Sequence, residues 1–592
     1  MTKIWGLLIL ACLSCPAGTV LATVFPPYIT LSVSGMTAEV SWEPVPGATG
    51  YTLYYAPYPY AGENTIGSLE LGAEPGFSAE LWPGAAYYVA VKARDGQGQS
   101  NYSNVEMFSL AALPADPALT VATLDNFQRI SQIPRCSGNR AQISAWLSDW
   151  AVTRQFPVRT DDFRNVLISV PASPGYEGHE TFIFQAHMDM VCDKVDGSAH
   201  NFASDPIALV QDGDWLHAFD TTLGADDGIG VATALALAEV PGIAHPPLEL
   251  LFTTDEETDM SGAGGLAADF LTGSKYINLD SETEGSVTLG AAGGEESDIS
   301  LPLTFSARDS NQQLFSLRID GLIGGHSGID IDKNRANANV LVAQAFPESI
   351  PFRMISFNGG TAKNTIPRSA EMIFALSPDQ VAPFQANLAA FEQAARAQYP
   401  NEVDLSITLT SLTDGPTQAV DALLSAKAVK LIVDIPYGVY TWSVEFPGLP
   451  ETSNNIGIVQ TDTALNKLSV TTFQRSFSVD ELEEITAVIE AAAANAGASS
   501  ARSGLFPPWP PDSTSDLYNS LLTTYEELFS TAMTTEVVHA GLECGYIAEK
   551  YPTMEIVSIG ATVESVHTTE ERLYLPSLDK VSQLLIALLK GL

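Results

Sequence analysis

The sequence of 592 residues predicts a multidomain fold: a small all-β sandwich precedes an α/β domain, and a second α/β domain is inserted into the first. Three observations predict this. The length exceeds that of one ordinary domain. Short alternating strands separated by Pro, Gly and Asp turns fill the region after the N-terminus, which is typical of a sandwich. Strands then alternate with helical patterns from Asn165 to Glu284, which indicates a largely parallel sheet, and the pattern changes near Gly294.

The composition narrows the classes of function. Apolar residues make up 45% of the chain, enough for large cores, and the formal net charge is −42. A charge of that sign argues against a nucleic-acid partner, because phosphates would repel it, and it favours solubility. Beyond the N-terminal segment, no run reaches the roughly 18 apolar residues of a membrane-spanning helix.

Residues 1–22 have the pattern of a secretory signal peptide. A charged start is followed by the apolar run Ile4–Leu13, and Val20-Leu-Ala22 resembles a cleavage site. We therefore expect a secreted or periplasmic protein. The run ending at Cys12 weakly resembles a bacterial lipoprotein box, so lipid anchoring is the second alternative.

Residues 24–110 contain the predicted sandwich, and residues 111–122 are the predicted linker. Trp42 and the pair Tyr87-Tyr88 suggest its core. The run Trp42–Tyr51 resembles a fibronectin type III module. Such a module would either be a passive spacer or contact a cell surface, a polymer or a partner, since folds of this class host many functions.

Residues 123–293 are the first part of the predicted α/β domain. Helical patterns at residues 123–133 and 141–153 precede its first candidate metal-binding strand. The candidate functional side chains lie at its strand ends. The apolar run Phe182–Ala186 leads into His187-Met-Asp189, whose side chains point the same way if the strand continues. That spacing suits a metal-binding histidine with a carboxylate behind it. The alternative is a strand end that faces solvent.

Two further junctions add carboxylates. Asp226 and Asp227 precede a predicted helix at residues 229–240, where they either cap the helix or let one carboxylate bridge two cations. The strand at residues 248–252 ends in Asp255-Glu256-Glu257, and adjacent glutamates project differently. One can bind metal while the other takes a proton from water.

The strand Tyr276–Leu279 delivers Asp280 at its carboxyl end, where ligands collect in open α/β sheets. His567, in a fifth segment near the C-terminus, is a candidate last ligand. Histidine and carboxylates together are the ligand set for zinc or a similar divalent ion. The pattern therefore predicts a two-metal peptidase.

Residues 294–502 are the predicted inserted lid domain, in which strands alternate with helices. The Pro-rich segment at residues 506–511 marks the return, and residues 503–592 are predicted to complete the first α/β domain. Cys136, Cys192 and Cys544 remain after signal cleavage. Because their number is odd and their spacing wide, we expect free buried thiols.

These segments resemble the aminoacyl-histidine dipeptidases (Xaa-His, carnosinase-like dipeptidases) of the di-zinc metallopeptidase clan. The resemblance extends from about Leu124 to the C-terminus. The motifs that carry it are HMDMV, TTLGADDGIG, TTDEET, INLDSE, GGHSGIDI, NTIPR, HAGLECG and SVHTTEER.

The resemblance implies two zinc ions per chain, and the ligand set also tolerates manganese or cobalt. His187 and Asp280 would bind one ion, and Asp226 would bridge both. Glu257 and His567 would bind the second ion.

The same resemblance assigns the remaining roles. Asp189 would orient His187, and Glu256 would be the general acid/base. His326 would stabilise the oxyanion, while Asn364 and Arg368 would hold the substrate.

Three departures from the family pattern put metal preference and substrate range in question. Asp227 stands where the family has Asn, and Asp259 replaces Gly. Thr568-Thr569 replaces Ser-Pro after the last histidine.

The expected function is a secreted metallodipeptidase that acts on short unblocked peptides, including Xaa-His. An N-acyl-amino-acid amidohydrolase or tripeptidase of the same clan is one alternative, and an inactive adhesion protein is another. The lid is the expected surface of a homodimer, unless a large lid lets one chain complete its own site.

Overall fold

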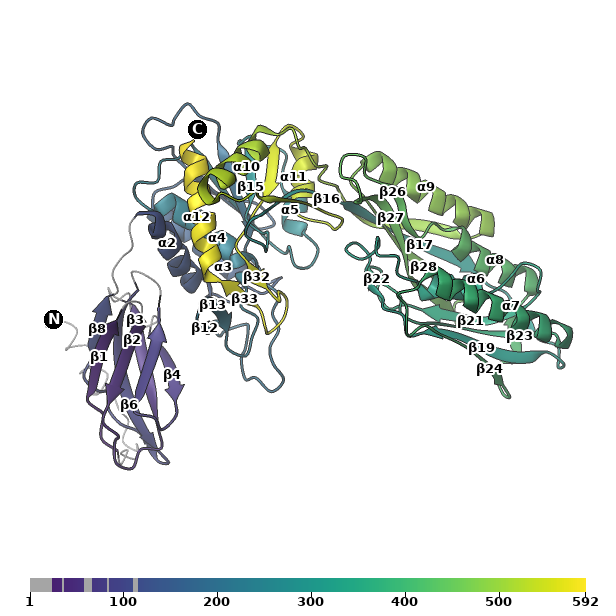
Figure 1. Cartoon of the computed structure of the whole chain (residues 1–592), viewed down its shortest axis with the longest axis horizontal. Helices are drawn as coiled ribbons and strands as arrows, with labels where there is room; N and C mark the ends of the chain where they lie inside the picture. The colour runs from purple at the N-terminus through teal and green to yellow at the C-terminus, as the bar shows by residue number, and fades with distance from the viewer. Residues whose placement is uncertain (1–23, 35–36, 58–65, 82–84, 110–114, 592) are drawn as a thin grey trace. The chain divides into compact units, whose positions relative to one another are not determined.

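The computed structural model describes residues 24–34, 37–57, 66–81, 85–109 and 115–591, and these form two compact units. Figure 1 labels their helices and strands. The first unit contains an N-terminal sandwich, a small sheet, α2, α4 and most of α12. The second contains an eight-stranded sheet and a nine-stranded sheet. The predicted signal peptide lies outside the described residues. None of the described helices combines the length and the apolar character that crossing a bilayer requires.

The N-terminal part is a β-sandwich of two antiparallel sheets that share one core. Trp42 meets Tyr51 from the other sheet edge-on, with ring centroids 5.0 Å apart, and the backbone N–H of Val45 donates to the hydroxyl of Tyr51. The sandwich predicted from strand alternation is present. Its strands are β1 (Ile29–Ser34), β2 (Thr37–Trp42) and β5 (Gly76–Glu80) in one sheet, and β3 (Gly50–Pro57), β4 (Gly67–Leu71), β6 (Ala86–Asp95), β7 (Gly98–Gln99) and β8 (Glu106–Ser109) in the other.

Three helices and a four-stranded sheet complete the first unit. Helix α2 begins at Ala115, earlier than the expected residue 123, so part of the predicted linker is helical. Asn126 of α2 donates to Glu239 of α4 at 2.8 Å, and this bond ties the two helices together. The elements are α2 (Ala115–Ile130), α4 (Ala225–Glu239), α12 (Leu575–Lys590), β12 (Leu209–Asp212), β13 (Trp215–Ala218), β32 (Val563–Glu564) and β33 (Arg572–Tyr574).

The eight-stranded sheet of the second unit is mixed, and its central strands are parallel. Every residue of β11 and β14 is buried, which agrees with near-continuous apolar runs in strands covered on both faces. In spatial order the strands are β30 (Thr534–Val538), β16 (Ser286–Ala291), β31 (Glu555–Ser558), β15 (Lys275–Asn278), β11 (Phe182–His187), β14 (Leu248–Thr253), β10 (Val166–Val170) and β9 (Val158–Thr160).

Helices of the second unit supply apolar cover for this sheet. Ile547 and Cys544 of α11 share a core cluster with Ile183, Leu251 and Tyr276 of the sheet. The helix predicted at residues 141–153 is α3. The helices that accompany the eight-stranded sheet are α3 (Ala141–Thr153), α5 (Ser261–Gly265), α10 (Asp516–Phe529) and α11 (Cys544–Lys550).

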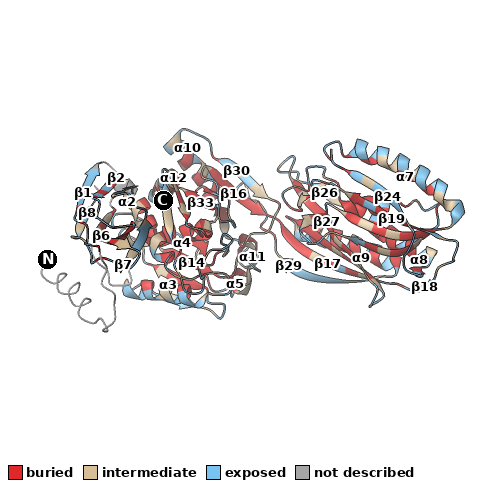
Figure 2. Cartoon of the chain, turned by 90° about the horizontal axis from the view of Figure 1, so that it is seen from below, coloured by how far each residue is buried: buried red, intermediate tan, exposed pale blue. Residues whose placement is uncertain are grey.

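The chain from Gly293 to Phe506, here called the insert, forms the nine-stranded antiparallel sheet. Figure 1 shows α6, α7, α8 and α9 beside the strands, and Figure 2 shows buried strands together with an exposed face of α7. Phe374 and Phe384, which belong to the sheet and to α7, pack at 5.1 Å in the core. The main elements are β17 (Gly293–Pro302), β19 (Gln313–Asp320), β21 (Arg353–Gly359), β23 (Ala370–Leu376), β24 (Ser406–Leu412), β26 (Gly438–Trp442), β27 (Pro450–Asp462), β28 (Lys467–Ser476), β29 (Ser499–Phe506), α6 (Ala338–Gln344), α7 (Pro378–Gln398), α8 (Ala422–Asp434) and α9 (Val479–Ala496).

The cysteines correct one expectation. Cys136 and Cys192 are disulfide-bonded, whereas Cys544 is a free, buried thiol. The expectation of three free thiols was therefore wrong for two of them. An odd count at wide spacing did not reveal a bond, because spacing along the chain says nothing about distance in the fold.

Candidate metal centre

Parallel pairing brings three chemically important segments to one edge of the eight-stranded sheet. In β11 and β14, His187 lies opposite Thr253, and Gln185 of β11 lies opposite Asn278 of β15. The residues that follow these strand ends are Glu256 and Asp280. Because carboxyl ends of parallel strands meet at one edge, this is where ligands collect in open α/β sheets.

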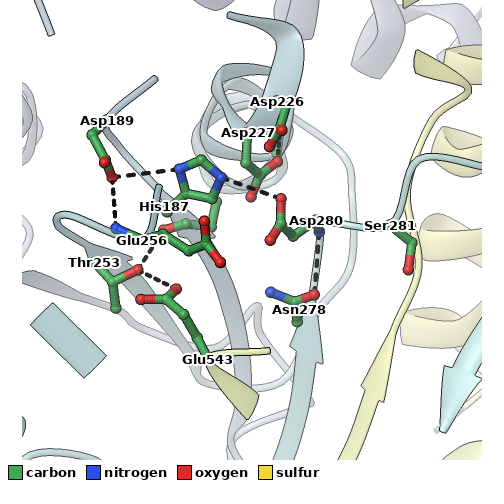
Figure 3. Close-up of polar contacts among 12 residues, drawn as sticks. His187, Asp189, Asp226, Asp227, Thr253, Glu256, Asn278, Asp280, Ser281 and Glu543 are labelled. Atoms are coloured by element: carbon green, nitrogen blue, oxygen red, sulfur yellow. Dashed lines mark hydrogen bonds and ion pairs between the residues drawn. The ribbon is translucent and has the colours of Figure 1, made fainter. Parts of the chain in front are cut away.

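His187 lies between two carboxylates (Figure 3). Its Nδ1 atom is 3.5 Å from an oxygen of Asp189, and its Nε2 atom is 3.4 Å from an oxygen of Asp280. The side chains of His187 and Asp189 are 1% and 2% exposed. The imidazole therefore has Asp189 on one side and presents its other nitrogen toward Asp280.

Asp189 is held by contacts that favour its charged form. It accepts hydrogen bonds from the hydroxyl of Ser137 at 2.7 Å and from the backbone N–H of Glu256 at 3.2 Å. Burial pushes the pKa of Asp189 upward, but these bonds and the interaction with His187 outweigh burial and leave the pKa below its usual value. Asp189 thus links the histidine to the turn that carries Glu256.

The turn before Glu256 has its own anchor. The buried Asp255 accepts a hydrogen bond from the N–H of Gly138 at 2.7 Å and forms an ion pair with Arg140 at 2.7 Å. The φ of Asp255 is +57°, a conformation that a non-glycine residue adopts only with support from its surroundings. The loop around Gly138 therefore holds both Asp189 and the glutamate turn.

A second pair of ligand candidates lies at the start of α4. The Nε2 atom of His567 is 3.1 Å from an oxygen of Asp226, and their side chains are 51% and 10% exposed. The neighbouring Asp227 is buried and accepts a hydrogen bond from the N–H of Gly230. Of the two aspartates, Asp227 therefore caps the helix and Asp226 faces the histidine.

The predicted metal ligands form two groups, and within each group the ligand atoms all lie within 4.8 Å of one another. One group is His187, Asp226 and Asp280, and the other is Asp226, Glu257 and His567. Two ligand atoms about 2.0 Å from a tetrahedral ion are about 3.3 Å apart. The 3.4 Å and 3.1 Å contacts of the two histidines match that spacing, so imidazole and carboxylate donors here suit divalent cations.

Sequence reasoning missed Glu543, whose side chain lies next to Thr253 and Glu256 (Figure 3). Its carboxyl group is buried and accepts hydrogen bonds from Gln185 at 2.8 Å and Thr253 at 2.7 Å. Burial first, and the charge of Glu256 second, raise the pKa of Glu543 to about 8. The motif HAGLECG contains this glutamate, but nothing in its pattern indicates that the side chain is buried.

The three residues expected to face the substrate lie in the insert. His326 is half-buried and accepts a hydrogen bond at Nδ1 from the N–H of Gly328; burial and the charge of Arg475 lower its pKa. Asn364 and Arg368 are exposed. Arg368 donates from Nε to the carbonyl of Leu322 at 3.0 Å.

Arg475 of β28 is a buried cation that sequence reasoning also missed. It is 4% exposed and stacks over the ring of Phe473, and within the described residues no ion pair joins it to a carboxylate. Burial lowers its pKa to about 10, so it remains charged at neutral pH. An arginine in a strand gives no sequence signal for such a role, because its burial depends on the packing of the whole insert.

His539 lies in the neighbourhood of this cation. Its Nε2 atom is 2.7 Å from the hydroxyl of Ser453, and its pKa is lowered to about 3, by burial first and by Arg475 second. His539 is therefore neutral near pH 7. It adds no second positive charge beside Arg475.

Comparison with known proteins finds related dipeptidases. The chain is 35% identical over 475 residues to the cytosol non-specific dipeptidase of Escherichia coli (strain K12), covering 79% of this chain and 96% of that protein. The crystal structure of aminoacylhistidine dipeptidase from Vibrio alginolyticus is 33% identical and superposes with a TM-score of 0.76, covering 80% of this chain and 96% of that one.

Residues 183–591 match peptidase family M20/M25/M40. This match covers more than half of the chain and includes all five predicted metal ligands. The chain therefore belongs to peptidase family M20/M25/M40 and is a peptidase homologous to aminoacylhistidine dipeptidase.

Proposed function

We propose that this chain is an exported metallodipeptidase that uses two divalent cations to hydrolyse short unblocked peptides, including Xaa-His. One observation carries the proposal: the buried His187 has Asp189 at 3.5 Å from one ring nitrogen and Asp280 at 3.4 Å from the other. A carboxylate that fixes the tautomer of a histidine is the usual partner of a metal ligand. The grouping of Asp226 with both histidines supports a pair of cations.

In this proposal, the five ligands are divided as the resemblance implies. His187 and Asp280 hold one cation, Glu257 and His567 hold the other, and Asp226 is shared. When bound, such cations polarise a peptide carbonyl and make water more acidic. The donor set suits zinc and also accepts manganese or cobalt.

Glu256 is the proposed proton carrier. Its backbone N–H donates to Asp189 at 3.2 Å, so the residue that orients His187 also fixes the backbone of Glu256. The carboxylate would take a proton from the attacking water and return it to the leaving amine, a role that contributes about 10²- to 10⁴-fold in such reactions. His326 is proposed to donate to the oxyanion, with its neutral form favoured by burial.

Arg475 is our proposed partner for the terminal carboxylate of the substrate. An arginine fork matches a carboxylate with two parallel hydrogen bonds. A buried cation such as Arg475, which has no ion pair with any described residue, gains most from such a ligand. Arg368, the earlier candidate, already donates to Leu322 and is exposed. We keep Arg368 and Asn364 as candidates for the rim of the substrate site.

Export is proposed on two grounds. Residues 1–22 have the composition of a signal peptide, and Cys136 and Cys192 are disulfide-bonded. Disulfides persist in oxidising compartments and are rare in the cytosol. The sandwich, which we propose to be fibronectin type III-like, would then act outside the cytosol as a spacer or a surface contact.

The test is hydrolysis of a panel of substrates by the mature chain. Free dipeptides including Xaa-His, tripeptides, and N-acyl amino acids are compared, each before and after chelation and after addition of zinc. We expect hydrolysis of the free dipeptides, loss of it with chelator, and recovery with zinc. Preferential hydrolysis of N-acyl amino acids or tripeptides would assign a different activity, and activity untouched by complete metal removal would refute the proposal.

A further inference from the structure

Glu571 binds the backbone that carries Asp226. Its side chain is 2% exposed, and its two carboxylate oxygens accept hydrogen bonds from four consecutive backbone N–H groups. Oε2 accepts from Leu223 at 2.8 Å and Gly224 at 2.9 Å. Oε1 accepts from Ala225 at 2.8 Å and Asp226 at 3.3 Å.

The local backbone explains why four donors converge on one carboxylate. Gly224 has φ of +67°, and successive N–H groups around a left-handed residue form a concavity that binds anions. In this chain the anion is a side chain of the protein itself. Hydrogen bonds to a charged acceptor are the strong ones, so residues 223–226 have little freedom to move.

Glu571 also stands four residues after His567, in the same short segment. His567 has φ of +63°, so its conformation depends on support from its surroundings. Its Nε2 atom lies 3.1 Å from the carboxylate of Asp226. One carboxylate therefore anchors the segment of the histidine to the backbone of the aspartate that it faces.

We propose that Glu571 is a positioning residue that fixes Asp226 and His567 relative to one another and thereby sets the affinity for the cations they hold. This inference rests on the proposed metal centre. It goes further because Glu571, which is not one of the proposed ligands, would determine the affinity of that centre for its cations. A role limited to anchoring α4 would affect stability and leave metal affinity unchanged.

The chain offers a matched control in the preceding residue. Glu570 has the same side chain and lies in the same segment, but it is exposed. Its backbone N–H donates to the hydroxyl of Thr568. The substitution Glu570→Gln removes the same charge from the same region without touching residues 223–226.

The experiment compares the mature wild-type chain with Glu571→Gln, Glu571→Asp and Glu570→Gln. In Glu571→Gln, the amide group turns one acceptor into a donor, so two of the four hydrogen bonds are lost. Zinc affinity and stoichiometry are measured by competition with a chromophoric chelator, the absorption spectrum of the cobalt-loaded protein is recorded, and unfolding of the metal-free protein is followed by circular dichroism.

We expect Glu571→Gln to weaken binding of at least one cation about 10- to 100-fold, the usual cost of losing a group that orients a ligand. The cobalt spectrum should change, and kcat/KM should recover when zinc is added in excess. Glu570→Gln should match the wild type in all of these. Glu571→Asp, which keeps the charge, should fall between.

The inference is overturned if the Glu571 variants fold and keep the wild-type zinc affinity and cobalt spectrum. It is also overturned if neither Glu571→Gln nor Glu571→Asp folds, because Glu571 would then have a purely structural role. Failure of the proposed function gives a different result: the wild-type chain itself would bind no pair of cations.

Discussion

The carboxyl group of Glu543 accepts a hydrogen bond from the hydroxyl of Thr253 at 2.7 Å, at the last residue of the strand that leads into Glu256. The same oxygen accepts from Gln185, two residues before His187. Glu543 thus bridges the ends of the two strands that deliver the histidine and the glutamate turn. Glu543 keeps its proton to a higher pH than an ordinary glutamate does, because burial and the charge of Glu256 raise its pKa to about 8.

The first prediction concerns stability and pH in the metal-free protein. Because the pKa of Glu543 is higher in the folded chain than the ordinary glutamate value, the folded state binds more protons between about pH 4.5 and pH 8. The contribution of Glu543 to stability should therefore fall as pH rises through that window. The substitution Glu543→Gln, which imitates the protonated form, should make the melting temperature less dependent on pH between 6 and 8.5.

Glu549 supplies the control for this measurement, because it is exposed and lies in α11, the helix that begins directly after Glu543. Glu549→Gln should reproduce the wild-type dependence on pH. The prediction is contradicted if the melting temperatures of the wild type and of Glu543→Gln both rise in the same way from pH 6 to pH 8.5.

The second prediction separates the adjacent glutamates. Glu256→Gln should lower kcat about 10²- to 10⁴-fold while metal content stays unchanged, because the residue carries protons in our proposal. Glu257→Gln should instead lower the zinc content, since Glu257 belongs to the group with Asp226 and His567. Elemental analysis and kinetics on the same samples distinguish the two. Equal loss of metal in both variants would defeat the division of roles.

The strands that precede Asp189 and Asp280 could be predicted from sequence, because an apolar run followed within a few residues by a carboxylate is a local pattern. The sequence also indicated α3 correctly. Helix α2 was expected to start later, since Pro114 and Pro117 favour a linker while tertiary contacts decide where a helix begins.

Residues that act through distant contacts could not be predicted in this way. Glu543 meets Gln185 across 358 positions of the chain, and Glu571 meets Leu223 across 348. Neither sequence separation nor residue type indicates such a contact. The burial of Arg475 likewise depends on the whole nine-stranded sheet, so the sequence directed attention to the exposed Arg368 instead.

The third prediction concerns the thiols of the mature chain, which retains Cys136, Cys192 and Cys544 if residues 1–22 are removed. In denaturant without reductant, one thiol should react with Ellman's reagent, and after reduction all three should react. In the native state Cys544 should react slowly, because burial raises the pKa of its thiol. Three reactive thiols before reduction would remove the disulfide as support for export.

The last prediction decides between two arginines as the partner of the substrate carboxylate. Arg475→Gln should raise KM for a free dipeptide about 10- to 100-fold, the value of a hydrogen bond to a charged group, and should affect the corresponding dipeptide amide much less. Arg368→Gln should change both substrates little, because Arg368 is exposed and donates to a backbone carbonyl of the insert. Circular dichroism of each variant excludes unfolding as the cause. If Arg368→Gln raises KM selectively for the free dipeptide while Arg475→Gln does not, Arg368 binds the substrate carboxylate. The buried Arg475 then has only a structural role.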